Sequence, residues 1–233
     1  MFTIYSLCEY AVTLEFDRSI DTQTLDQITR FNTLLNQRPF DGFEATVPAY
    51  ATLSVFFDPL QVMQSSRLRG SNCFQRVSDY LKTVQQESHK VDTAPENTVT
   101  IPVCYGGEFG PDLDEVAHRN KLTPADVIRQ HSTALYRVYL IGFTPGFPYL
   151  GGLPSQLATP RKQTPRASVP RGSVGIAGEQ TGIYSQDTPG GWQIIGRTPL
   201  SLFDVKNNPP ARLKAGDRII FQPISPDQFD SNG

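Results

Sequence analysis

Basic side chains gather in one part of this sequence without an acidic neighbour. From Val127 to Gly178, 52 consecutive residues, there is no Asp or Glu, although the chain has 23 acidic residues among 233. A fold that gathers the basic groups of this stretch would create a positive local potential. We therefore expect a pocket for a carboxylate or a phosphate, and the alternative is a solvated loop whose arginines lie beside acids from elsewhere. The stretch carries Arg129, His131, Arg137, Arg161, Lys162, Arg166 and Arg171.

Two arginines of this acid-free stretch have the same local setting. Thr159-Pro160-Arg161 and Thr164-Pro165-Arg166 each place an arginine directly after a proline, five residues apart. Proline restricts the backbone, and a side chain held rigidly loses less entropy when it grips a ligand. The guanidinium group also binds carboxylates through two parallel hydrogen bonds and keeps its charge. Arg161 and Arg166 are thus predicted to bind the anionic part of a substrate.

A glycine-rich segment follows at residues 175–191. Glycines allow a ligand to approach the backbone closely, and Gln180, Thr181 and Tyr184 offer neutral hydrogen bonds within the same segment. We add these three residues to the predicted binding site. Two other interpretations stay open: the glycines can serve only to turn the corners of a barrel, and Trp192, the single tryptophan, can be a core residue.

Several familiar sites are excluded by spacing. The chain has no GxxxxGK[ST] phosphate loop and no GxGxxG after a strand. Residues 171–175, RGSVG, miss the GxSxG pattern of serine hydrolases because Arg171 replaces its first glycine. The three histidines lack the spacing of metal ligands, so no metal site is predicted. His131, just past a helix end and beside the arginines, is a candidate for proton transfer.

Charge and composition exclude further classes. With 21 basic and 23 acidic residues the net charge is −2, so no general positive field exists for nucleic acid or an anionic membrane. No apolar run reaches the ~18 residues of a membrane span. The start lacks the features of a signal peptide, and Cys8, Cys73 and Cys104 form neither a CxxC pair nor an even set. These features predict a cytoplasmic protein.

The distribution of glycine and proline divides the chain into two parts. These residues number 6 in positions 1–100 and 31 in positions 101–233, a shift too large for one uniform architecture. The polar segment 92–97 lies at the change and resembles a linker. We therefore predict a domain over 1–97, a second domain over 98–225, and a disordered tail over 226–233.

The first part shows patterns of both strands and helices. Alternating or apolar runs predict strands, whereas helical spacing of apolar residues predicts two helices, the first capped by Asp21 or Ser19. The order ββαββαβ predicts an α+β domain with helices on one face of an antiparallel sheet. The predicted strands are 2–6, 10–16, 43–48, 52–57 and 99–103, and the predicted helices are 20–36 and 71–87.

The second part is mainly β. One helical region is predicted over 112–118 and 123–130, where Thr123-Pro124 gives an N-cap with proline at the first helical position. Short apolar runs separated by glycine and proline then predict a closed or nearly closed β-barrel. The predicted strands are 136–143, 173–177, 193–197, 201–203 and 218–222.

Three motifs of the second part resemble a known family. They are CYGGEFGPDL at 104–113, GFTPGFPYL at 142–150 and IGRTPL at 195–200. Together with the Pro-Arg pairs they are similar to the family named variously allophanate hydrolase subunit 1, Kip inhibitor and the B subunit of 5-oxoprolinase. The match is dense from about Val103 to Asp204. The resemblance implies a cyclophilin-like barrel after a small α+β domain.

The resemblance also implies a function within a complex. Members work with a C-type sister subunit, the allophanate hydrolase subunit 2 or Kip antagonist type, and with an A-type subunit. Together they form a hydrolase that uses ATP, at the level of the complex, to open the cyclic amide 5-oxoproline to glutamate. The residues expected to act are Arg161 and Arg166 on the carboxylate or a phosphorylated intermediate, Gln180, Thr181 and Tyr184 on the amide, and Glu108 or His131 in proton transfer.

Two other functions stay open within the same resemblance. Related paired domains form the carboxyltransferase part of urea carboxylase, so a subunit of the allophanate or urea carboxylase type is one alternative. A Kip-inhibitor relative instead blocks a sporulation histidine kinase, which makes a regulatory protein that inhibits a sensor histidine kinase the other.

Overall fold

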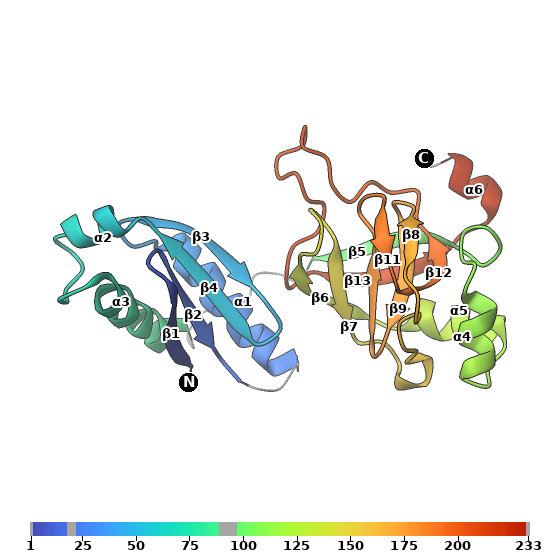
Figure 1. The fold of residues 1–233 in the computed structure, drawn as a ribbon, viewed down its shortest axis with the longest axis horizontal. Helices are drawn as coiled ribbons and strands as arrows, with labels where there is room; N and C mark the ends of the chain where they lie inside the picture. Colours follow the sequence, from blue (N-terminus) through green and yellow to red (C-terminus); the bar gives the residue numbers. More distant parts are fainter. Residues whose placement is uncertain (1, 18–21, 89–96, 232–233) are drawn as a thin grey trace. The chain divides into compact units, whose positions relative to one another are not determined.

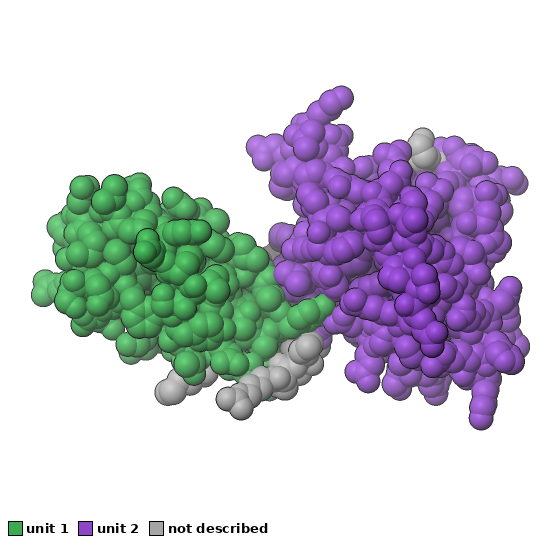
Figure 2. Space-filling model, viewed as in Figure 1, with its two compact units in different colours: residues 1–95 green, residues 96–233 purple. Residues whose placement is uncertain are grey.

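The computed structural model of the chain describes residues 2–17, 22–88 and 97–231. The chain divides into two compact units, residues 1–95 and residues 96–233 (Figures 1 and 2). Each unit has a hydrophobic core of its own. The sequence analysis predicted the domain boundary after residue 97, at the end of the segment 92–97. Most of this segment lies outside the described residues. The expected helix caps Ser19 and Asp21 also lie outside them.

The first unit is an α+β structure, as predicted. Its sheet is antiparallel throughout, with strand order β1-β2-β4-β3, and α1 and α3 cover one face of it (Figure 1). The sequence missed α2, a short helix capped by Asp58. The elements are β1 (Thr3–Cys8), β2 (Ala11–Glu15), α1 (Thr22–Gln37), β3 (Phe43–Pro48), β4 (Thr52–Phe57), α2 (Pro59–Gln64) and α3 (Cys73–Ser88).

Alternation along the strands decides which side chains enter this core. Val12 and Leu14 of β2 and Leu53 and Val55 of β4 face the helices and are buried. The helices bury one stripe each, spaced by three or four residues as an amphipathic helix requires. The buried stripes are Ile28, Phe31, Leu34 and Leu35 on α1, and Val77, Leu81 and Val84 on α3.

The last strand predicted for the first unit belongs to the second. Strand β5 (Thr98–Tyr105) pairs in parallel with β13 (Arg218–Pro223) and antiparallel with β12 (Gln193–Arg197), so the predicted order ββαββαβ is wrong in its final strand. The reason is tertiary, because Ile101 and Val103 pack into the core of the second unit. A run of apolar residues does not say which sheet it joins.

The second unit is a closed barrel of seven strands, which confirms the predicted fold class. The strand order is β10-β7-β6-β13-β5-β12-β9, and β8 and β11 form a separate two-stranded sheet. The sequence analysis did not predict β7, β8, β10 and β11. Its predicted strand 201–203 is not a strand in the structure, where Phe203 only forms an isolated bridge with Ala211. The remaining strands are β6 (Tyr136–Ile141), β7 (Pro148–Gly151), β8 (Arg166–Val169), β9 (Ser173–Ala177), β10 (Gln180–Ile183), β11 (Thr188–Gly190) and β12 (Gln193–Arg197).

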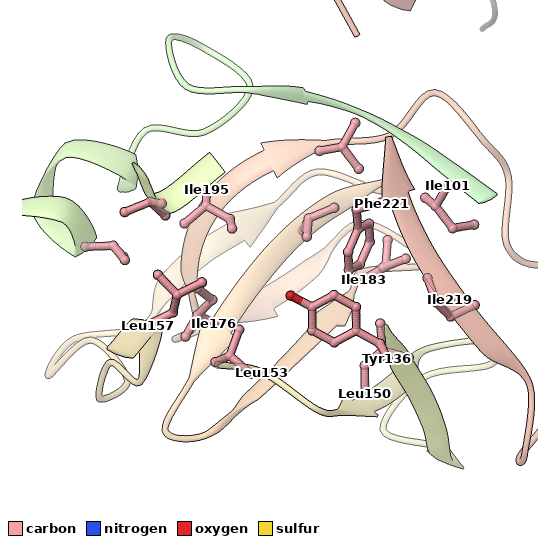
Figure 3. Close-up of a cluster of buried hydrophobic side chains, with 14 of the residues drawn as sticks. Ile101, Tyr136, Leu150, Leu153, Leu157, Ile176, Ile183, Ile195, Ile219 and Phe221 are labelled. Atoms are coloured by element: carbon pink, nitrogen blue, oxygen red, sulfur yellow. The ribbon is translucent and has the colours of Figure 1, made fainter. Parts of the chain in front are cut away.

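Apolar side chains from the strands fill the barrel. Figure 3 shows Tyr136, Leu150, Ile183 and Phe221 pointing toward one another in the interior, and all four are buried. Burial of this kind stabilises a fold by roughly 1.5–3 kcal/mol for each large apolar side chain. The barrel is therefore a packed core and not a channel.

The described residues of the second unit also form three helices and one 3₁₀ turn. Helix α4 (Leu113–Arg119) and helix α5 (Pro124–Thr133) lie close to their predicted ranges, followed by the turn η1 (Ser155–Leu157). Thr123 caps α5, as predicted, and the structure adds that it does so through a reciprocal capping box with Asp126. Among the described residues, no helix is both long and apolar enough to cross a membrane.

The end of the chain differs from its expected disorder. Residues Pro226–Ser231 form helix α6. Phe229 of this helix packs on Phe109, with ring centroids 4.6 Å apart, and the guanidinium of Arg197 lies 5.8 Å from the Phe229 ring centroid. One aromatic anchor in a polar segment thus holds residues 226–231, a contact that the composition does not reveal, while residues 232–233 of the predicted tail lie outside the described residues.

Candidate functional site

The outer face of the barrel carries a second, aromatic cluster. Side chains alternate along a strand, so Leu150 of β7 and Ile195 of β12 enter the barrel core, whereas Tyr149 and Ile194 face outward. Val169 of β8 joins this cluster, so the two-stranded sheet lies against the barrel here. The buried members are Phe147, Val169, Ala177, Tyr184, Trp192 and Ile194.

Trp192 lies against this face because two glycines leave room for it. A Cβ at Gly182 would stand 2.9 Å from the Trp192 ring and 3.0 Å from the Phe147 ring. A Cβ at Gly175 would stand 3.0 Å from the Cβ of Trp192. Phe147 meets Trp192 edge-on, with ring centroids 5.4 Å apart. At these two positions the glycines therefore serve the close packing of an aromatic side chain.

Beside this cluster lies a pocket of about 290 Å³. Its walls are almost entirely apolar and aromatic, a common composition for small-molecule sites. One charged side chain contributes, the guanidinium of Arg161, which lies 5.9 Å from the centroid of the Trp192 ring. The lining residues are Phe143, Phe147, Tyr149, Arg161, Pro165, Tyr184, Pro189, Gly190, Gly191 and Trp192.

Arg161 is free to bind an anion. Its side chain is exposed, and it forms no ion pair with any acid of the described chain. An arginine over an aromatic ring is attracted to the negative face of that ring, which fixes its position without using its hydrogen-bond donors. The donors of Arg161 thus remain available to a ligand in the pocket.

Arg166, in contrast, is held by an internal carboxylate. Its Nη2 donates to Oδ1 of Asp112 at 2.7 Å, and Nζ of Lys162 donates to the same oxygen at 3.0 Å. Burial alone would raise the pKa of Asp112, but the hydrogen bonds from Arg166, the Ile194 backbone and Lys162 outweigh it and lower that pKa. The two interpretations of the acid-free stretch therefore divide by residue: Arg161 faces a pocket, whereas Arg166 is paired with an acid from elsewhere.

Tyr184 supplies one of the two phenol groups of the pocket, and Tyr149 supplies the other. The Tyr184 side chain is buried, and burial raises its pKa above the usual value, so the hydroxyl stays protonated at neutral pH. A Cβ on Gly190 would collide with this hydroxyl, so the glycine allows β11 to pass close to it. A neutral phenol beside an exposed guanidinium can donate a hydrogen bond to a carbonyl group.

Comparison with known proteins identifies the family. The family model described as carboxyltransferase domain, subdomain C and D, matches residues 2–213. The B subunit of 5-oxoprolinase from Bacillus subtilis is 43% identical over 96% of this chain and 93% of its own length. That of Escherichia coli O157:H7 is 40% identical over 94% of both chains. This chain belongs to the family of 5-oxoprolinase B subunits. The resemblance that the motifs indicated is thereby confirmed.

A solved structure of the same fold supports this membership. The crystal structure of TTHA0988 superposes with a TM-score of 0.77 at 33% identity and covers 92% of this chain. This chain spans 40% of the length of that protein. The designation of the family relatives as B subunits also implies that those proteins work with partner subunits.

Two predicted site residues of this family member lie inside the barrel, away from the pocket. His131 is fully buried and stacks on Phe221, with ring centroids 4.5 Å apart. Because Thr181 Oγ1 donates to the Gly175 carbonyl, it accepts from His131 Nε2–H at 3.1 Å, and His131 Nδ1 accepts from the Tyr105 hydroxyl at 2.8 Å. Burial lowers the pKa of His131 to about 3. The structure therefore holds His131 neutral, in a core hydrogen-bond chain with Thr181.

The other two predicted residues also stand outside the pocket. Glu108 is exposed on the turn between β5 and α4. Gln180 begins β10, pairs with Ala177 across the β9–β10 hairpin and is half-buried. Neither is among the residues that line the pocket. Of the seven predicted residues, only Arg161 and Tyr184 line the pocket. Arg166 begins strand β8 and does not line it.

The sequence missed most of the pocket wall. Phe143, Phe147 and Tyr149 come from the motif GFTPGFPYL, which carried the family resemblance without a role for any single residue. Phe143 differs from the other two residues in its exposure and backbone. It is exposed and has a φ of 68°, a left-handed conformation that is uncommon for a bulky residue. Within the described residues, no group of three or more His, Cys, Asp and Glu side chains is placed to hold a metal ion.

Proposed function

We propose that this chain is the B subunit of an ATP-dependent 5-oxoprolinase and that the pocket beside Trp192 binds the substrate. The observation that carries this proposal is the exposed Arg161 guanidinium over Trp192, in a pocket otherwise walled by aromatic and apolar groups. The family relationship supports the substrate, because the relatives at 40% and 43% identity bear that name.

The chemistry of 5-oxoproline fits this combination of groups. It has a five-membered lactam ring, largely apolar, and one carboxylate. The carboxylate would pair with Arg161 through charge-assisted hydrogen bonds, and the ring would pack between the aromatic walls. The Tyr184 hydroxyl would donate to the lactam carbonyl and so orient the amide. In this arrangement the chain binds and positions the substrate, a contribution that lowers the barrier without a nucleophile of its own.

The remaining parts of the reaction are assigned to partner subunits. No complete set of nucleophile and base lines the pocket among the described residues, so a C-type sister subunit would complete the site and an A-type subunit would complete the enzyme. ATP is assigned to the complex, where it drives the opening of the lactam, and to no residue of this chain. We place the complex in the cytoplasm, because Cys8, Cys73 and Cys104 are all free thiols.

Reconstitution tests this function. The chain is co-expressed with A-type and C-type subunits, and ATP hydrolysis is measured with and without 5-oxoproline. We expect 5-oxoproline-dependent hydrolysis from the complex and none from the chain alone. A complex that hydrolyses no ATP in response to 5-oxoproline would overturn the proposal, and so would steady turnover of 5-oxoproline by the isolated chain.

A further inference from the structure

We propose that Asp112 is a positioning residue, whose buried carboxylate clamps the segment 160–166 and thereby holds Arg161 at the pocket. The role in catalysis rests on the proposed function, whereas the clamp itself is a property of this chain. Asp112 is not among the residues that line the pocket, so it would act only through the residues that it binds.

The carboxylate of Asp112 joins three parts of the barrel. It is 3% exposed, and Oδ1 accepts from both Arg166 and Lys162. Oδ2 accepts from the Ile194 backbone N–H at 2.7 Å, and the Asp112 N–H donates to the Ile194 carbonyl at 2.8 Å. Asp112 is thus fixed to β12 by two hydrogen bonds and reaches from the start of α4 to the arginine-bearing segment.

Both donors of this clamp follow Arg161 in the chain. Lys162 follows it directly, and Arg166 lies five residues later. The backbone is held as well, because Lys162 N–H donates to the Gly191 carbonyl at 2.7 Å and the Gln193 side chain donates to the Pro160 carbonyl at 3.1 Å. Arg161 therefore has an anchored residue before it and another after it.

The same clamp also supports the glycine part of the pocket wall. Arg166 pairs with Gly190 across β8 and β11, and the hydrogen bond from Lys162 ends on Gly191. Gly190 and Gly191 both line the pocket. A movement of Lys162 or Arg166 would thus shift the guanidinium and the glycine wall together.

Charge gives the clamp a second effect. Asp112 neutralises part of the charge of Lys162 and Arg166, and Glu115 accepts a further hydrogen bond from Lys162 at 3.0 Å. Arg161, with no acidic partner in the described chain, remains the cation that faces the pocket. The clamp thereby directs an anionic substrate group to Arg161 and away from the two neighbouring basic side chains.

A spectroscopic test follows the position of Arg161 directly. Trp192 is the only tryptophan, so the labelled chain gives one indole N–H signal in a nitrogen–proton correlation spectrum. Arg161→Ala removes the guanidinium from the indole and should shift this signal. Asp112→Asn should shift it in the same direction, whereas in the Arg161→Ala background it should add little. A wild-type signal position in Asp112→Asn would overturn the proposal.

A matched control separates this role from loss of any buried carboxylate. Asp217 is also 3% exposed and accepts from Lys214 Nζ, but it is not part of the pocket or of the clamp. Asp217→Asn should lower the melting temperature and leave the Trp192 signal in place. If Asp112→Asn does not fold, Arg166→Gln removes one donor of the clamp and should give the same shift. An unshifted signal in Arg166→Gln would then contradict the proposal.

Activity of the reconstituted complex gives the second readout. Asp112→Asn should lower kcat/KM for 5-oxoproline about tenfold, and less than twofold once Arg161 is already Ala, because residues that act through one another are not additive. If Asp112→Asn and Arg161→Ala lowered kcat/KM independently, so that the double variant showed the product of the two effects, Asp112 would not act through Arg161. If the wild-type complex has no such activity, the proposed function fails, and the Trp192 signal still decides whether the clamp exists.

Discussion

The Arg161 guanidinium lies over the indole ring of Trp192, 5.9 Å from its centroid, at the edge of an aromatic pocket. This relationship joins the acid-free stretch of the sequence to its only tryptophan. The ring holds the side chain by its face, so the hydrogen-bond donors stay free for an anion.

Replacement of Arg161 should affect activity far more than stability. We expect Arg161→Ala to change the melting temperature little, because the side chain is exposed, forms no ion pair in the described chain and loses only its contact with the Trp192 ring. The complex should lose roughly ten- to a hundredfold in kcat/KM, as expected when a charge-assisted contact worth about 1.5–3 kcal/mol is removed. Arg161→Lys should rescue poorly, since the planar fork is lost. Equal turnover in wild type and both variants would remove Arg161 from the site.

Arg166 should behave in the opposite way to Arg161. Arg166→Ala takes one donor from the buried carboxylate of Asp112, and an under-satisfied buried acceptor costs about 1–3 kcal/mol. We therefore expect a measurable fall in the free energy of unfolding by urea titration, with Arg161→Ala as the paired control. If both alanine variants unfolded at the wild-type urea concentration, the ion pair with Asp112 would contribute nothing.

Acid should destabilise the barrel through His131. Its folded pKa of about 3 lies below the unfolded value near 6.5, so the unfolded chain binds the extra proton between these values. The stability that the neutral histidine contributes is complete above pH 6.5 and is lost as the pH falls toward 3. The slope contributed should approach about 1.4 kcal/mol per pH unit.

Urea titrations at several pH values measure this dependence. His131→Gln keeps a neutral hydrogen-bonding side chain that does not titrate, so its unfolding free energy should change less between pH 6.5 and 4. Parallel pH profiles for the wild type and the variant would show that His131 is not the group responsible.

A methyl group at Gly182 should disturb the aromatic pocket. Gly182→Ala places a Cβ 2.8 Å from the Pro148 carbonyl and 2.9 Å from the Trp192 ring, so one of them must move. Overpacking of this kind costs about 1–3 kcal/mol, and we expect a red-shifted Trp192 emission with a lower melting temperature. Gly142→Ala is the control, since its Cβ would stand 3.7 Å from the nearest atom. Similar melting temperatures for the two variants would contradict this assignment.

The barrel unit should fold by itself when β5 is included. We predict that a fragment of residues 97–233 gives a cooperative thermal transition in circular dichroism, because the unit has its own core. A fragment of residues 106–233 should not, because it lacks the strand between β13 and β12 that closes the barrel. Cooperative melting of the shorter fragment would show that closure through β5 is dispensable.

The sequence by itself determined the features that depend on neighbouring residues. Helical spacing located α1 and α3, the Thr123-Pro124 pair located the start of α5, and the change in glycine and proline content separated the two architectures. Strands β9 and β12 also matched their predicted ranges, since their buried apolar runs are bounded by turns. The motifs were long enough to identify the family, and membership of that family indicates the substrate.

Only the tertiary structure decided which charged side chains can bind a ligand. Arg161 and Arg166 have the same local sequence, yet Asp112, about fifty residues earlier, lies within 2.7 Å of one and pairs with it, while the other lies over Trp192. The same holds for His131 and β5, because burial in the barrel core and pairing with β13 both depend on residues distant in the chain. The spacing of neighbouring residues determines the local backbone conformation. Which acid pairs with an arginine, and which strand pairs with another, is decided only when distant parts of the chain meet in the folded barrel.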